Sequence, residues 1–311
     1  MKKQMVKQIL RVLLWGLFSP VCLAAPLKVG ISLVDLSNPF FSILAEKLSL
    51  SVKEKYDGEV EIYVQSSAYN LSKQIVQLEG FLQDDIDLIF IAASESKAIA
   101  PFINTARQKG VIVVAVDIES EGADISVTSD NHQAGFSACH YLAQHLKETG
   151  EVAIINGQPI SSVINRVSGC KSAFEKFPGI KVVSATRNSS GTYSGGLESM
   201  TYLLLQYPEL GGVFTINDPA ALGALEAAVQ SGNEKIKIVS VDGSPEFIES
   251  LKEGKQNLLA SARQFPGLMA VRAVELAMQK LNGSAEDKAV ELIPTRLVTT
   301  ENKEQVEGWL K

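Results

Sequence analysis

The residue types that most often carry metal or nucleophilic chemistry are scarce in this chain of 311 residues, which has three histidines, three cysteines and two tryptophans. His140 and His145 are five positions apart, so they cannot share one face of a helix and hold a metal ion between them. The chain also lacks a P-loop pattern and a Gly-x-Gly-x-x-Gly pattern after an apolar run. We therefore expect no metal site, no cofactor and none of the enzyme classes that these motifs mark.

Long apolar runs are missing too, except near the amino terminus. There, four basic residues precede the apolar stretch Val12–Phe18, and small residues follow at Cys22 and Ala24. This arrangement is typical of a cleaved secretory signal peptide, and the apolar stretch is too short to span a bilayer. We predict that residues 1–24 are removed on export to the periplasm; an amino-terminal anchor helix is the less favoured alternative.

Basic residues are in the minority. The chain has 29 Lys and Arg against 35 Asp and Glu, and four of the basic residues lie within residues 1–24, so the chain after residue 24 has a net charge of −10. An acidic surface without basic clusters argues against nucleic acid and anionic membranes as partners.

Only two cysteines, Cys139 and Cys170, follow the predicted signal peptide. An exported protein folds in an oxidising compartment, where a pair of cysteines is more often a disulfide than two free thiols. We therefore favour a disulfide between Cys139 and Cys170, while two buried thiols on separate helices stay an open alternative.

Apolar runs of strand length alternate with amphipathic helical stretches along the rest of the chain. Near-continuous Val and Ile runs such as residues 111–116 are typical of parallel strands buried on both faces, so the pattern predicts a doubly wound α/β fold. A polar stretch from Glu119 to Asp124 precedes a new strand–helix series and indicates two similar α/β lobes. We expect strands at residues 27–34, 59–64, 87–93, 111–116, 151–156, 180–184, 212–215, 236–240 and 258–262, and helices at residues 71–84, 97–109, 131–147, 219–231 and 265–281.

The segment Ser37-Asn-Pro-Phe-Phe41 comes shortly after the first apolar run. Open α/β sheets bind ligands at the carboxyl ends of their strands, where this segment is expected to lie. Phenylalanine rings offer flat apolar faces to C–H surfaces, and an amide offers donors and an acceptor, so Asn38, Phe40 and Phe41 suit a small polyhydroxyl ligand. In the alternative interpretation, Pro39 opens a helix and both rings enter the core.

Planar polar side chains recur at or after the ends of the other expected strands. Carboxylate, guanidinium and amide groups bind neighbouring hydroxyls in pairs, accepting from one and donating to the next. Their recurrence favours a shared ligand site made of Asp117, Arg166, Asn217, Asp242 and Gln264.

N-capping is a simpler explanation for some residues at strand ends. Asp218 is favoured as the N-cap of the helix at 219–231. Either Asp130 or Asn131 is expected to cap the helix at 131–147.

The remaining strand-end residues also have alternatives. Asp242 before Gly243 could simply shape a turn. A single arginine such as Arg166 is more often a surface or ion-pairing residue than a ligand contact. Asp117 and Asp242 could be the acid and base of a glycoside hydrolase. We prefer the interpretation that both carboxylates accept hydrogen bonds from hydroxyl groups.

Several short segments stand in a fixed order along the chain: Asn38-Pro-Phe-Phe41, Val116-Asp117, Ser129-Asp-Asn131, Arg166-Val-Ser-Gly169, Asn217-Asp218 followed by Ala220–Leu225, Val241-Asp-Gly243 and Gln264. In their order and spacing they resemble the periplasmic sugar-binding proteins of ABC importers, the ribose-binding type within the LacI-related fold. The resemblance covers the chain after residue 24. It implies two lobes joined by a hinge of three strands, which cross near residues 129–131, 264–265 and 293–294.

The resemblance also implies lobe boundaries and a ligand set. One lobe is expected to hold residues 25–129 and 265–293, and the other residues 130–264 and 294–311. The implied ligand contacts are Asn38, Phe40, Phe41, Asp117, Arg166, Asn217, Asp242 and Gln264.

The sequence departs from the ribose-binding pattern at two places. Ile118 stands where ribose binders have an arginine after the aspartate, and the stretch from Ser189 to Tyr193 has no aromatic residue in the matching register. The one tryptophan after the signal peptide, Trp309, lies in the carboxyl tail, so indole stacking on a ligand is not expected. These losses favour another pentose, a hexose or a polyol at least as much as ribose.

We expect a monomeric periplasmic solute-binding protein, not an enzyme, which captures a monosaccharide or polyol, closes around it and delivers it to an ABC permease. The alternative is a sugar-sensing subunit for a membrane receptor kinase or chemoreceptor, which the sequence cannot separate from an importer component. A LacI-type repressor is excluded because the chain has a signal peptide and no helix-turn-helix segment.

Overall fold

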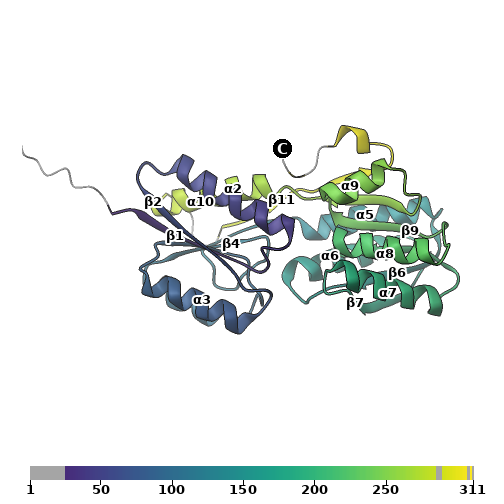
Figure 1. Cartoon of the computed structure of the whole chain (residues 1–311), viewed down its shortest axis with the longest axis horizontal. Helices are drawn as coiled ribbons and strands as arrows, with labels where there is room; N and C mark the ends of the chain where they lie inside the picture. The colour runs from purple at the N-terminus through teal and green to yellow at the C-terminus, as the bar shows by residue number, and fades with distance from the viewer. Residues whose placement is uncertain (1–24, 285–288, 307–308, 310–311) are drawn as a thin grey trace, which may run out of the picture.

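Two α/β lobes lie end to end in the computed structural model, which describes residues 25–284, 289–306 and 309 (Figure 1). The predicted signal peptide, residues 1–24, lies outside the described residues. Each lobe is built on a six-stranded sheet. In the described part of the chain, no helix is both long and apolar enough to cross a membrane.

The first sheet has the strand order β11-β5-β4-β3-β1-β2, and all of its strands are parallel. Helices α2 and α10 pack on one face, and α3 and α4 cover the other, so the apolar strands are buried on both sides, as a doubly wound fold requires. The strands are β1 (Leu27–Leu33), β2 (Val60–Ser66), β3 (Leu88–Ile91), β4 (Ile112–Val116), β5 (Ile125–Ser129) and β11 (Ala289–Ile293), and the helices are α2 (Pro39–Lys55), α3 (Leu71–Gln83), α4 (Ala100–Gln108) and α10 (Pro266–Leu281).

The second sheet has the order β12-β10-β9-β8-β6-β7, in which only β12 is antiparallel to its neighbour. The other strands run toward the junction of the lobes and end there. Strand β12 begins at the junction, after the chain has crossed from the first lobe, and runs in the opposite direction. The strands are β6 (Thr149–Asn156), β7 (Gly179–Asn188), β8 (Leu210–Thr215), β9 (Lys237–Asp242), β10 (Leu258–Arg263) and β12 (Arg296–Thr299), and the helices are α5 (Asn131–His145), α6 (Ser161–Phe174), α7 (Tyr193–Gln206), α8 (Asp218–Gln230), α9 (Pro245–Lys252) and the 3-10 turn η1 (Lys303–Gln305).

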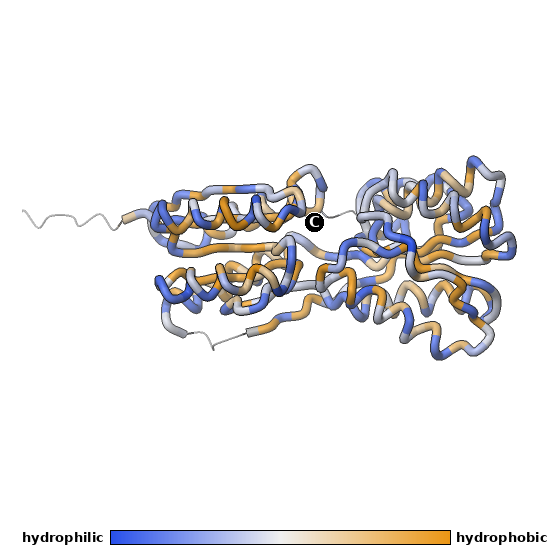
Figure 2. The backbone as a smooth tube through the Cα atoms, turned by 90° about the horizontal axis from the view of Figure 1, so that it is seen from below, coloured by the Kyte–Doolittle hydropathy of each residue, from blue (hydrophilic) through white to orange (hydrophobic). Residues whose placement is uncertain are grey.

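Apolar segments run through the middle of both lobes, with polar residues gathered on the surrounding helices and turns (Figure 2). The chain passes between the sheets three times, from β5 to α5, from β10 to α10 and from β11 to β12. Two of the crossings touch, because Asp130 N donates to Ile293 O (2.8 Å). Thr295 N donates to Gln133 Oε1 (2.9 Å), so side chains of α5 also hold this junction together.

The element types predicted from the sequence are confirmed, while some boundaries are wrong. The helix expected from residue 97 begins at Ala100, where Pro101 occupies its first turn. The helix expected to reach residue 147 ends at His145, because Lys147 and Glu148 have positive φ angles of 56° and 63°. Of the two N-caps expected for α5, Asp130 is the one observed.

Helices α5 and α6 make an unusually close contact. Cys139 and Cys170 form a disulfide between them, with a Cα–Cα distance of 5.0 Å. Gly135 and Gly169 lie at the same contact, and a Cβ added at Gly169 would be 2.0 Å from His132 O. The disulfide favoured from the sequence is therefore confirmed, and it joins two helices that already touch through their backbones.

Replacing both cysteines with serine is expected to lower the free energy of unfolding by about 3 to 4 kcal/mol. The bridge closes a loop with a sequence separation of 31 residues, and its loss returns that loop's freedom to the unfolded chain. Urea unfolding of the oxidised protein and of the C139S/C170S variant measures the difference. Equal midpoints and slopes would contradict a stabilising disulfide.

Candidate ligand-binding site

A cavity between the two lobes is lined by all eight residues that the sequence nominated: Asn38, Phe40, Phe41, Asp117, Arg166, Asn217, Asp242 and Gln264. Its volume is about 50 Å³, which is below the usual range of small-molecule sites. The tertiary structure thus brings together residues that are up to 226 positions apart, because the strands of both sheets end at this junction. Their role in binding a ligand stays a prediction.

The beginning of α2 forms one wall of the cavity. Asn38 is the N-cap, and its side-chain oxygen accepts a hydrogen bond from Phe40 N (3.0 Å). Phe40 and Phe41 form a T-shaped pair with ring centroids 5.3 Å apart. Both rings are buried in the core and also line the cavity, so the two interpretations of this segment hold at the same time.

Asp117 follows β4 with a φ angle of 62°, a left-handed conformation that few residues other than glycine adopt. Its backbone is held there by hydrogen bonds from Asp117 N to Val127 O (2.9 Å) and from Thr128 Oγ1 to Asp117 O (2.6 Å). The side chain is 4% exposed, and its Oδ1 has no hydrogen-bond partner in the described residues. A buried acceptor without a donor is costly, so this oxygen is available to a ligand hydroxyl.

Burial raises the pKa of the Asp117 carboxyl to about 6, and the negative charge of Asp242 adds to the shift. The Arg166 guanidinium acts in the opposite direction. Asp117 is therefore mainly ionised above pH 7, and it gains or loses its charge in the mildly acidic range.

Arg166, on α6, is the one cation that lines the cavity among the residues that the structure describes. Its Nη1 donates to Asp242 Oδ1 (3.2 Å) and to Ile216 O (2.7 Å), while its Nε donates to Asn131 Oδ1 (2.8 Å). The side chain is 5% exposed and pairs with Asp242. Of the two alternatives for Arg166, the surface residue is therefore wrong and the ion-pairing residue is confirmed. Its hydrogen bonds fix the guanidinium plane and the carboxylate of Asp242 at the edge of the second sheet.

Gln264 lies directly after β10, at the second crossing between the lobes. Its Nε2 donates to Asp242 Oδ1 (2.8 Å), and its Oε1 is buried without a partner in the described residues. The side chain is 1% exposed. Gln264 and Asp117 therefore each leave an acceptor oxygen unpaired at the cavity, and such a pair of acceptors matches a ligand that carries several hydroxyl groups.

The N-cap expected at Asp218 is wrong. Asn217 caps α8, since its Oδ1 accepts from Ala220 N (3.2 Å), and its Nδ2 donates to Gly191 O (2.8 Å). Asparagine and aspartate are equally good caps, so the local sequence could not choose between neighbours.

Long-range contacts decide the place of Asp218. Its carboxylate accepts from Ser244 N (2.6 Å) and from Ser261 Oγ (2.7 Å) beneath the cavity. Burial raises the pKa of Asp218, and the adjacent Asp242 raises it further. The pKa of Asp242 is raised in the same way by burial, against the effect of Arg166. Asp218 thus supports the edge of the second sheet from behind and does not line the cavity.

Sequence reasoning did not select eight further residues that line the cavity: Tyr69, Gln158, Ile160, Ser162, Val163, Ser190, Gly191 and Ile216. Tyr69 lies three residues after β2, so the rule that ligands bind at strand ends could have found it. The serines and apolar residues carry no such signal, because similar residues occur throughout the chain. Tyr193, the aromatic residue of the stretch from Ser189, is 47% exposed and not part of the lining.

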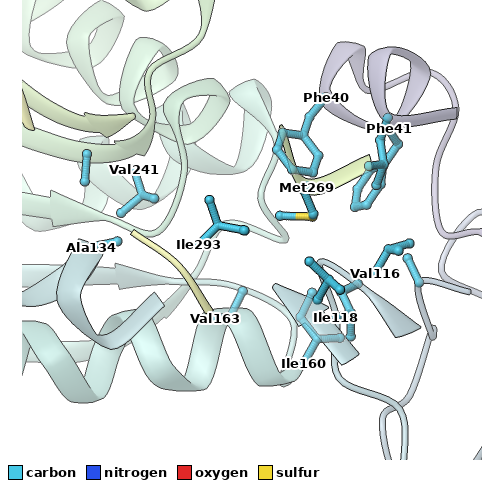
Figure 3. Packing of buried hydrophobic residues seen from close by; sticks show 14 of the residues in the cluster. Phe40, Phe41, Val116, Ile118, Ala134, Ile160, Val163, Val241, Met269 and Ile293 are labelled. Carbon is cyan, nitrogen blue, oxygen red and sulfur yellow. The ribbon is translucent and has the colours of Figure 1, made fainter. Parts of the chain in front are cut away.

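Ile118 has a packing role in the place where the resemblance leads one to expect an arginine. It is fully buried in a cluster that includes Val116 from the same lobe and Ile160 and Val163 from the other, as Figure 3 shows. A hydrogen bond from Glu119 N to Ser161 Oγ (2.9 Å) joins the lobes beside it. The two lobes are therefore in direct contact across the cavity's margin.

Trp309 lies behind the cavity and is only 5% exposed. Its Nε1 donates to Asp242 O (2.8 Å), and its ring meets Phe40 edge to face, with centroids 5.5 Å apart. It is not among the lining residues, but it connects a lining residue of one lobe to a lining residue of the other.

The sequence model of a protein family, described as the periplasmic binding protein domain, matches residues 29–285 of the chain. The chain belongs to this family. Its resemblance to the ribose-binding type is confirmed by the ribose import binding protein of Bacillus subtilis, which is 31% identical over 274 residues that cover 87% of each chain. In the described residues, no group of three or more potential metal ligands occurs.

Solved structures of similar proteins have the same two-lobed fold. The Caulobacter myo-inositol binding protein bound to myo-inositol is 26% identical, with a TM-score of 0.81, and the match covers 91% of this chain and 98% of that one. The fructose binding periplasmic domain of a hybrid two-component system superposes with a TM-score of 0.82 over 89% of this chain and 92% of that domain. At 24% identity, this second likeness shows the fold alone. The named relatives are binding proteins and not enzymes.

Proposed function

We propose that this periplasmic binding protein captures a monosaccharide or polyol between its lobes and delivers it to the permease of an ABC importer. The observation that carries the proposal is the pair of buried, unpaired acceptors, Asp117 Oδ1 and Gln264 Oε1, in a cavity walled by two phenylalanine rings. A sugar has a C–H face for the rings and a rim of hydroxyl groups for the acceptors. Hydroxyl groups donating to these oxygens would remove the cost of leaving them unpaired.

In this proposal, residues 25–129 and 265–293 move as one lobe, and residues 130–264 and 294–311 as the other. The assignment is supported by the membership of the strands in the two sheets. The ligand touches both lobes only in the closed state, so its binding favours closure. The apolar contact of Ile118 with Ile160 and Val163 adds to the stability of that state. We propose further that the protein is a monomer released from residues 1–24 in the periplasm.

Calorimetric titration with D-ribose, D-allose, D-arabinose, D-fructose, xylitol and myo-inositol tests the proposal. We expect at least one of these ligands to bind with a 1:1 stoichiometry and to raise the melting temperature. The chain lacks the arginine after Asp117 that ribose binders have, so we expect ribose not to be the tightest of the panel. An absence of binding to all of them would overturn the proposed function.

A sensory role is the second candidate, because the same fold occurs in the periplasmic domain of a two-component system. The two roles differ in what the closed protein contacts and not in the cavity. Reconstituting the protein with the membrane components encoded next to it distinguishes them. Ligand-dependent ATP hydrolysis supports import, and ligand-dependent autophosphorylation supports sensing.

Ligand affinity is expected to increase as the pH rises from 5 to 7 and to level off above pH 7. The raised pKa of Asp117, about 6, leaves the carboxyl partly protonated in this range, and a ligand hydroxyl that donates to Oδ1 favours the ionised form. The affinity then changes by up to about tenfold per pH unit below the pKa, with release of a proton on binding.

Titrations at pH 5, 6, 7 and 8 in buffers with different ionisation enthalpies measure both the affinity and the proton release. The unbound protein should show the opposite trend. Its folded state holds the Asp117 proton to a higher pH than the unfolded state, so its free energy of unfolding falls as the pH rises from about 4 to about 6. An affinity that is constant from pH 5 to pH 7 would contradict a direct role for Asp117.

A further inference from the structure

Tyr69 lies on the boundary between two cavities. The inner one is the candidate ligand site, and a larger outer cavity of about 790 Å³ adjoins it. Within the described part of the chain, three residues line both: Tyr69, Gln158 and Ile160. The outer cavity is lined mainly by polar residues of the loops after β3, β4 and β6, among them Ser96, whose hydroxyl is buried without a partner in the described residues.

The backbone holds Tyr69 in a conformation that it would not adopt without external constraints. Ala68 and Tyr69 have φ angles of 52° and 54°, and consecutive left-handed residues other than glycine are strained. Three hydrogen bonds impose this turn, from Ser67 N to Leu33 O (3.0 Å), from Tyr69 N to Val34 O (3.0 Å) and from Asn70 N to Ser67 O (3.1 Å). The turn is thus anchored to β1, and the direction of the tyrosine side chain is set by the fold.

The surroundings of the Tyr69 hydroxyl are acidic. Burial raises the pKa of Tyr69, and the charges of Asp117, Asp35 and Asp242 raise it further, so the phenol stays protonated and can donate. Its oxygen makes no hydrogen bond to another described residue. The cavity is therefore lined by an O–H donor, on Tyr69, as well as by the two acceptors without partners in the described residues.

We propose that Tyr69 is a ligand-contacting residue that sets the size limit of the site. Its hydroxyl donates to an oxygen at the outer end of the bound ligand, and its ring separates the inner cavity from the outer one. The inference rests on the proposed function. It predicts that the protein accepts a free monosaccharide or polyol and rejects the same ligand when a glycosidic or ether substituent extends toward the outer cavity.

Two variants separate the roles of the hydroxyl and the ring. Tyr69→Phe removes only the hydroxyl, whereas Tyr69→Asn removes the ring with a residue that tolerates the left-handed conformation. Tyr63→Phe is the matched control, because Tyr63 lies on β2 with its hydroxyl on Glu61, away from both cavities. Each protein is titrated with D-ribose, D-allose, D-arabinose and myo-inositol, with the methyl and phenyl glycosides of the three sugars, and with mono-O-methyl-myo-inositol. Urea unfolding confirms that each variant is folded.

We expect Tyr69→Phe to weaken binding of the free ligand about tenfold, which corresponds to one hydrogen bond. We expect Tyr69→Asn to bring the affinity for the substituted ligand to within about threefold of that for the free ligand, against a difference of at least thirtyfold in the wild type. Unchanged affinity in Tyr69→Phe, or unchanged discrimination in folded Tyr69→Asn, overturns this inference and leaves the proposed function standing. Failure of the wild type to bind any of the free ligands overturns both.

Discussion

An Asp117→Asn variant is expected to bind its ligand about 10- to 150-fold more weakly, while the unbound protein becomes more stable above pH 7. The loss corresponds to one charge-assisted hydrogen bond from a ligand hydroxyl. The gain arises because the buried carboxylate of Asp117 has an unpaired Oδ1 and a raised pKa of about 6, so its ionisation costs folding free energy. Asparagine keeps the left-handed backbone at this position. Calorimetry gives the affinity, and urea unfolding at pH 8 gives the stability.

Asp124→Asn is the matched control. Asp124 is equally buried in the same lobe, but both of its carboxylate oxygens accept a hydrogen bond. It accepts from Arg107 Nε (2.8 Å) and from Val113 N (2.9 Å). Its amide variant is expected to lose about 2 kcal/mol of unfolding free energy, because an amide NH₂ group faces a donor, and to keep the ligand affinity. Wild-type affinity in Asp117→Asn would remove Asp117 from the proposed site.

A Gly169→Ala variant is expected to lose at least about 2 to 3 kcal/mol of unfolding free energy and much of its ligand affinity. The added methyl group would lie 2.0 Å from the carbonyl oxygen of His132, a backbone atom, so α5 and α6 must move apart. The same two helices carry the hydrogen bond from Arg166 Nε to Asn131 Oδ1. Separating them therefore displaces the guanidinium of Arg166 in the cavity. Urea unfolding and calorimetry measure the two losses.

Gly80→Ala is the control for the intrinsic effect of the substitution in a helix. Gly80 lies within α3, and a Cβ added there meets no other atom within 4 Å. The free energy of unfolding of this variant is expected to rise by about 0.5 to 1 kcal/mol, and its ligand affinity is expected to stay the same. If both variants are stabilised alike, the close approach of α5 and α6 does not exist in solution.

Much of the site was predictable because open α/β sheets bind their ligands at the carboxyl ends of their strands, so the lining residues are expected just after the apolar runs. Asp117, Asn217 and Asp242 each follow an apolar run that is visible in the sequence, and all line one cavity. Tyr69 obeys the same rule but was missed, because β2 is half exposed and its end is less distinct. Trp309 could not be placed by any local rule, since its partners are Phe40 and Asp242.

The sequence by itself determined the alternation of strands and helices, the division into two lobes and the set of polar residues at the strand ends. These features depend on apolar periodicity and turn chemistry, which act over a few neighbouring residues. Only the tertiary structure decided that Asn217 and not Asp218 caps α8, that Arg166 is buried against Asp242, and that Phe40 serves both core and cavity. Each of these outcomes depends on burial and on donors contributed by distant segments, which no local pattern encodes.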